Sequence, residues 1–185
     1  MLPAASAAPA SADLPNDGAQ SASSSAWRLD LSGDRFSGVV PRRLVILFAP
    51  TRPDTKLAGE MFRHVELLRR QGLISTFTSP SPGAHIKNTF LENIATADVI
   101  LALLSADFLA DTDCFERVEL ALNSAKRCVP IVIRACDWKH SRLGEHQCLP
   151  ENGRPITDWG HDSVGRDRGW MEVVSGLRRL IRSLE

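Results

Sequence analysis

The stretch VILALLSADFL at residues 99–109 decides the fold. Its first six residues, 99–104, are apolar without alternation, which is typical of a strand buried on both faces of a parallel sheet. The segment Ser105-Ala106-Asp107 then ends the strand, because Ser and Asp favour turns over strand interiors. The sequence therefore predicts a sheet with helices on both sides, and the rest of the chain repeats the same unit.

Strands are also predicted at Leu44–Phe48, Leu73–Phe77 and Val129–Ile133, and a short last strand is expected near Ile156. Between the strands, apolar residues recur at helical spacing. They are Leu57, Met61, Val65 and Leu68, then Ile86, Phe90 and Ile94, then residues within a helix from about Asp113 to Lys126, and finally Trp170, Val174, Leu177, Ile181 and Leu184. Strands that alternate with helices indicate a doubly wound parallel sheet, whose ligand crevice lies at the carboxyl ends of the strands.

Composition excludes several classes of function. The 185 residues include 22 Lys and Arg against 22 Asp and Glu, so no net charge attracts nucleic acid or acidic lipid. The longest apolar runs have about six residues, whereas a membrane-spanning helix needs roughly 20. Four cysteines without CxxC spacing fit neither a disulfide framework nor a zinc ribbon, so we expect reduced thiols in a cytoplasmic protein.

The N-terminal segment differs from the rest of the chain. Its first 26 residues contain nine Ala, six Ser and three Pro, with Asp13 and Asp17 as the charged residues. Such a segment cannot bury enough apolar surface to offset its ordering entropy. It also lacks the basic start and apolar run of a secretory signal. We expect residues 1–42 to be a disordered tail and linker, and residues 43–185 to form one domain.

Metal, hydrolase and nucleic-acid motifs are weak. The spacing of Cys136, His140, His146 and Cys148 matches no compact zinc pattern, so we predict no metal site. Ser105 follows a strand but lacks the flanking glycines of a nucleophile elbow. The basic run of Arg178, Arg179 and Arg182 fits a solvated helix end better than a nucleic-acid patch.

One pair of residues is placed for chemistry. If a helix begins near Asp113, Phe115 and Glu119 lie one turn apart on one face, beside the predicted crevice. An aromatic ring can hold a planar group, and a partly desolvated carboxylate can stabilise positive charge developing on a sugar. The alternative is that Phe115 is a core residue and that Glu119 is a solvated helix residue that pairs with Arg117 or Asn123.

The order of these segments resembles the Toll/interleukin-1 receptor (TIR) domains of bacteria. The landmarks are LVILF at 44–48 with Asp54 six residues on, LLRRQGLI at 67–74, a loop ending Pro82-Gly83, ADVI at 97–100, LSADFL at 104–109, VPIVIR at 129–134, CDW at 136–138, Leu149-Pro150, Trp159 and Trp170. The resemblance implies a flavodoxin-like fold with a central sheet of five parallel strands and helices on both faces.

The resemblance also implies an activity. Many TIR domains cleave NAD between nicotinamide and ribose, and they need the Glu of an aromatic-x-x-x-Glu pattern on the third helix. FERVE at 115–119 matches that pattern, with Phe for the usual Trp, so the catalytic role falls on Glu119. Glu116 is the alternative register, with Thr112 in place of an aromatic. By the same resemblance Phe48, Phe77 and Phe115 bind the substrate, and NAD is a substrate rather than a cofactor.

Assembly is the second implied property. Residues 79–83 correspond to the family's BB loop, so Pro80, Ser81, Pro82 and Gly83 are expected to join domains. The expected partners are other TIR domains and an upstream sensor protein or fused domain, in bacterial immune, antiphage or cell-suicide signalling. Phe48-Ala49 replaces the Ser-Tyr common in relatives, and the loop carries no charge. A non-catalytic adaptor that works by assembly alone is therefore the alternative function.

Overall fold

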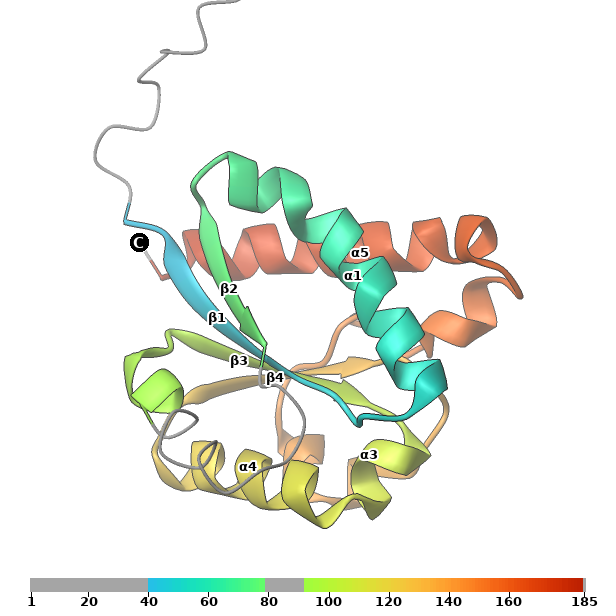
Figure 1. The fold of residues 1–185 in the computed structure, drawn as a ribbon, viewed down its shortest axis with the longest axis horizontal. Coiled ribbons are helices and arrows are strands. Elements are labelled where there is room, and N and C mark those ends of the chain that lie inside the picture. The colour runs from blue at the N-terminus through green and yellow to red at the C-terminus, as the bar shows by residue number, and fades with distance from the viewer. Residues whose placement is uncertain (1–39, 79–91, 185) are drawn as a thin grey trace, which may run out of the picture. The chain divides into compact units, whose positions relative to one another are not determined.

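The computed structural model describes residues 40–78 and 92–184, with the side chains of residues 77 and 78 left out. Residues 1–39 of the expected tail and linker, the loop residues Pro80 to Gly83, and Ile86 and Phe90 lie outside this part of the chain. The elements carry the labels of Figure 1.

A parallel sheet forms the centre of the described residues, in the order β2-β1-β3-β4. Its strands are β1 (Arg42–Leu47), β2 (Ile74–Thr78), β3 (Val99–Leu104) and β4 (Arg127–Val132). All of their pairings are parallel. Every residue of β3 is buried, as the unbroken apolar run predicts. The predicted α/β architecture is confirmed, with four strands in the described residues.

The prediction of a strand near Ile156 is wrong. Ile156 begins a short 3-10 helix, η3 (Ile156–Trp159). The position beside β4 is instead taken by Leu149, which makes a single parallel bridge to Ile131. Pro150 follows at once and has no N–H to donate, so a ladder cannot continue through it.

Helices cover both faces of the sheet (Figure 1). The helices α1 (Arg52–Arg70) and α5 (Ser163–Arg182) lie on one face, and α3 (Ala106–Ala110) and α4 (Thr112–Asn123) on the other. Alternate residues of β1 face the two sides of the sheet, because successive side chains of a strand point in opposite directions. Leu44 and Ile46 pack with α1 and α5, whereas Val45 and Leu47 pack with α4.

A buried ion pair joins α1 to α5. Arg166 donates from Nη2 and Nε to the carboxylate of Glu60 at 2.6 and 3.0 Å, and Trp170 Nε1 donates at 3.1 Å. Burial opposes ionisation of Glu60, but these hydrogen bonds outweigh it and hold its pKa below the ordinary value. The two helices therefore share one fixed alignment.

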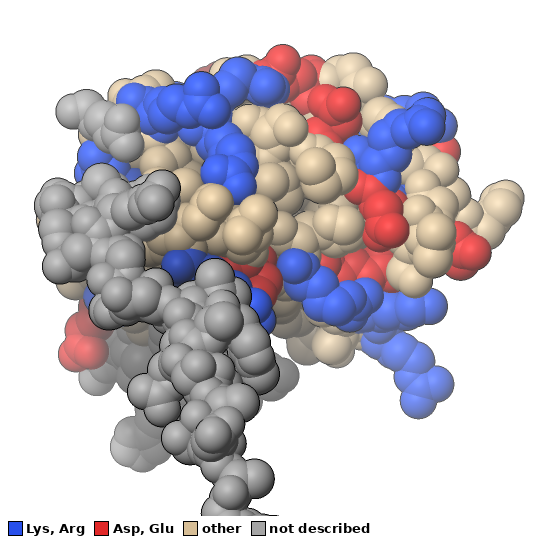
Figure 2. Space-filling view, turned by 90° about the horizontal axis from the view of Figure 1, so that it is seen from above, with Lys and Arg blue, Asp and Glu red and all other residues tan. Residues whose placement is uncertain are grey.

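Figure 2 looks onto the side that carries α1 and α5, where basic and acidic side chains are interspersed with uncharged ones. Arg178 donates to Gln71 and Arg179 to Glu151, so two of the three arginines singled out in the sequence have partners within the domain. This agrees with a solvated helix face. Among the described helices, none is both long and apolar enough to cross a bilayer.

Two glycines give a matched test of the packing. A Cβ on Gly176 of α5 would lie 2.3 Å from Cδ2 of the buried Leu149, whereas a Cβ on Gly59 of α1 would meet nothing within 4 Å. We expect Gly176→Ala to lower the free energy of unfolding by about 1–3 kcal/mol through overpacking. Gly59→Ala should raise it by up to about 1 kcal/mol, since Ala favours helix. Denaturant unfolding measures both, and equal effects would contradict this packing.

Candidate active site

Three strand ends meet at one buried carboxylate. Asp54, in the first turn of α1, is fully buried. The hydroxyl of Ser105, directly after β3, donates to its Oδ2. Arg134, two residues after β4, donates from Nη1 to its Oδ1 at 2.9 Å. The same Ser105 oxygen accepts from the backbone N–H of Phe108 at 2.9 Å and so caps α3. We call Asp54, Ser105 and Arg134, together with Asp107, the edge network.

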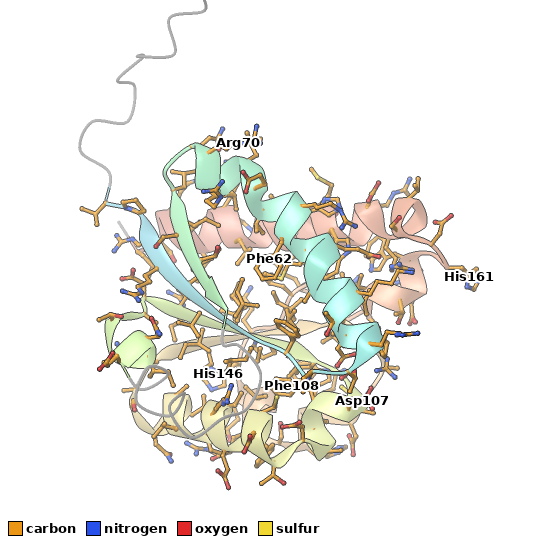
Figure 3. All side chains as sticks on the ribbon, in the orientation of Figure 1. Phe62, Arg70, Asp107, Phe108, His146 and His161 are labelled. Carbon is orange, nitrogen blue, oxygen red and sulfur yellow. The ribbon has the colours of Figure 1, made fainter. Side chains whose placement is uncertain are left out.

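Asp107 completes the edge network on its exposed side. Arg134 donates to Asp107 Oδ2 at 2.5 Å, and Thr51 Oγ1 donates at 3.3 Å. The hydrogen bond from the guanidinium lowers the pKa of Asp107. Figure 3 labels Asp107 near the start of α1. No sequence pattern indicated the contact among these residues, although each of them follows a predicted parallel strand and parallel strands end at the same edge of a sheet.

The first turn of α4 is fixed against the end of β1. Asp111 caps the helix by accepting from Cys114 N–H at 2.8 Å. The Cys114 thiol donates to the carbonyl oxygen of Phe48 at 3.6 Å. Burial, followed by the nearby Asp111, raises the pKa of this thiol to about 12, so it stays protonated at neutral pH. The role of Cys114 is therefore structural.

Phe115 and Glu119 share the accessible side of α4, as their spacing predicts. The side of α4 that faces the sheet consists of Cys114, Val118 and Ala121. Phe115 is 37% exposed, so the core interpretation of this residue is wrong. Glu119 is 27% exposed and accepts a hydrogen bond from Arg142 at 2.5 Å. Glu116, the alternative in the pattern, is exposed.

The structure does not bring the ring of Phe48 to this pair. Phe48 follows Leu44 and Ile46 in the alternation of β1 and packs with the cluster under α1 and α5, on the opposite side of the sheet from α4. Its main-chain oxygen is the part that contacts α4. The backbone of Phe77 pairs with Val45, and its side chain lies outside the described residues. The expected loop, Pro80 to Gly83, lies outside them too.

Cys148, His140 and a pocket beside β4 lie away from Phe115 and Glu119. The Cys148 thiol donates to Pro150 O at 3.4 Å, and His140 pairs with Asp137. Within residues 40–78 and 92–184, no three His, Cys, Asp or Glu side chains are grouped to hold a metal ion. A pocket of about 510 Å³ lies between β4 and α5, and its lining includes Arg127, Glu151 and Arg179 but not Phe115 or Glu119.

The edge network predicts the effect of removing Arg134. In Arg134→Ala the buried carboxylate of Asp54 loses its cation and keeps the Ser105 hydroxyl, so the free energy of unfolding should fall by about 3 kcal/mol. Arg127→Ala, at the exposed start of β4, should change it by about 0.5 kcal/mol or less. Urea denaturation of both variants is the measurement. Equal losses would mean that Arg134 does not hold the strand ends.

Comparison with known proteins gives three findings. The TIR domain family model matches residues 56–162. An uncharacterized protein of Sinorhizobium fredii is 33% identical over 140 residues, covering 72% of this chain and 42% of that protein, so the chain spans less than half of this relative. The crystal structure of the TIR domain of the Toll-related receptor TRR-2 from Hydra magnipapillata aligns with a TM-score of 0.49 and 21% identity, over 75% of this chain and 97% of that one.

Proposed function

The chain belongs to the TIR domain family, and from that premise we propose that it cleaves NAD at the bond between nicotinamide and ribose, on the accessible side of α4. The observation that carries the proposal is the pairing of Phe115 with Glu119. One helical face presents an aromatic ring and a carboxylate one turn apart, both partly open to solvent. The family includes NAD-cleaving enzymes, and this is the combination that such a cleavage requires.

The chemistry asks little of the protein. The bond between nicotinamide N1 and ribose C1′ breaks, its electron pair stays on the nicotinamide, and positive charge develops on the ribose. Water then adds to C1′ and releases a proton, so the products are nicotinamide and ADP-ribose. Because the pyridinium is already a good leaving group, catalysis consists of holding the ribose and stabilising the positive charge. We assign both tasks to Glu119, and contact with the substrate's rings to Phe115.

The remaining parts of the proposal extend beyond α4. Phe77, in β2, is proposed to border the nicotinamide subsite. Phe48, whose ring packs on the other side of the sheet from α4, is not retained as a substrate contact. Residues 80–83 are proposed as the loop through which TIR domains of this protein assemble. Clustering by an upstream sensor protein or a fused domain would then switch the enzyme on in the bacterial cytoplasm, in immune or cell-suicide signalling.

An adaptor that binds partners without chemistry is the second candidate. The observation in its favour is that α4 exposes two large apolar side chains, Phe115 and Leu120, each 37% accessible. An exposed apolar side chain serves protein contacts as readily as substrate contacts. The two candidates differ in whether Glu119 is needed for a reaction.

The decisive variant is Glu119→Gln, with Glu116→Gln as its matched control on the same helix. Artificially clustered wild-type protein should release nicotinamide from NAD. Glu119→Gln should reduce the rate by roughly 100-fold or more, because it removes the charge that stabilises the transition state. Glu116→Gln should stay within about twofold, since its side chain is exposed and points to another side of α4.

The readout is nicotinamide, quantified chromatographically over time. Absence of release from the clustered wild type would reject catalysis and favour the adaptor. Release that is unchanged in Glu119→Gln would show that an enzyme is present but that its carboxylate lies elsewhere.

A further inference from the structure

We propose that Arg142 binds the diphosphate of the substrate. In the free protein, where no diphosphate is bound, its guanidinium pairs with Glu119 instead. The inference rests on the proposed function and adds to it a residue that sets specificity for dinucleotides. It starts from a contact that no sequence pattern indicated. Arg142 opens the 3-10 helix η2 (Arg142–Glu145), 23 residues from Glu119 along the chain.

One nitrogen of Arg142 makes both of its contacts. Nη1 donates to Glu119 Oε2 at 2.5 Å and to Asn123 Oδ1 at 2.9 Å. Within the described residues, Nε and Nη2 of the same guanidinium have no hydrogen-bond partner. The side chain is 51% exposed. A guanidinium that uses one nitrogen for its present contacts can donate two hydrogen bonds from its remaining N–H groups to an oxyanion. This bidentate arrangement is the one that arginine favours.

The main chain at Arg142 is firmly held although its side chain is not. Ser141 Oγ accepts from Leu143 N–H at 3.3 Å and donates to Trp138 O at 2.6 Å. Leu143 and Trp138 on either side are buried. Gly144 passes so close to the preceding turn that a Cβ there would lie 2.1 Å from a backbone oxygen. The arginine therefore projects from a rigid base, and only its side chain needs to move.

Charge explains why such a residue is needed. NAD carries two negative phosphates, and a carboxylate beside its ribose repels them unless a cation is close. Arg142 supplies a positive charge in direct contact with Glu119. Because both partners are partly solvated, their ion pair contributes little stability and can exchange for a phosphate contact. The diphosphate, joined to the ribose at its 5′ position, is the next charged group along the substrate.

The alternative role for Arg142 is that of a latch, a residue that only blocks Glu119. If Arg142 only blocked Glu119, its removal would speed turnover of NAD, and nothing would depend on phosphate. If it binds the diphosphate, its removal weakens the binding of every ligand that carries a diphosphate and spares ligands without one. The two roles therefore predict opposite changes.

The test compares Arg142→Ala with Arg142→Lys and with Arg168→Ala, an exposed arginine on α5, in the clustered full chain. We expect Arg142→Ala to raise KM for NAD about tenfold or more, the cost of losing a charged hydrogen bond, with kcat within about threefold. Inhibition by ADP-ribose should weaken by a similar factor, and inhibition by nicotinamide should stay within about twofold. Arg142→Lys should recover part of the loss, and Arg168→Ala should match the wild type.

Three results would overturn the inference. Faster turnover in Arg142→Ala would identify a latch. Equal weakening of inhibition by ADP-ribose and by nicotinamide would identify general damage to the site. An unchanged KM for NAD in Arg142→Ala would show that Arg142 does not contribute to the binding of NAD. Failure of the clustered wild type to release nicotinamide is a different outcome, which rejects the proposed function itself and this inference with it.

Discussion

A single buried carboxylate sets the constraint on which this domain depends. Asp54 lies at the edge where β1, β3 and β4 end, fully removed from solvent, and receives hydrogen bonds from Ser105 and Arg134. A buried charge is tolerated only with its partners in place. The turn before α1, the cap of α3 and the segment after β4 are therefore fixed relative to one another. Because α4 follows α3 after one residue, the position of Phe115 and Glu119 depends on the same contact.

The groups that hold the strand ends together differ from those to which the chemistry is assigned. The edge network consists of groups that hydrogen-bond one another around the fully buried Asp54. Glu119 is the opposite case, a partly exposed carboxylate with an exposed arginine as its partner. Exchange of that partner costs little, whereas exchange within the edge network would leave Asp54 unpaired. A TIR domain can in this way keep a rigid sheet edge and still present an adaptable charged pair nearby.

The sequence was sufficient for features that depend on local periodicity. The run at 99–104 predicted β3 with its observed bounds, and the spacing of Phe115 and Glu119 predicted their shared helix face. The direction of the Phe48 ring was missed, although its parity with Leu44 and Ile46 pointed to the α1 side. Contacts between residues far apart in the sequence could not be predicted from local periodicity. The Arg134 to Asp54 bond spans 80 residues, and the Arg142 to Glu119 bond depends on how an irregular segment folds.

The decisive measurement locates a bound NAD analogue on the domain. The measurement is a titration of the isotope-labelled full chain with a hydrolysis-resistant NAD analogue, followed by the amide resonances of the domain in NMR spectra. We expect the largest shifts on α4 around Phe115 and Glu119 and on η2 around Arg142. Shifts confined to the pocket between β4 and α5, or no shifts at saturating analogue, would contradict this expectation.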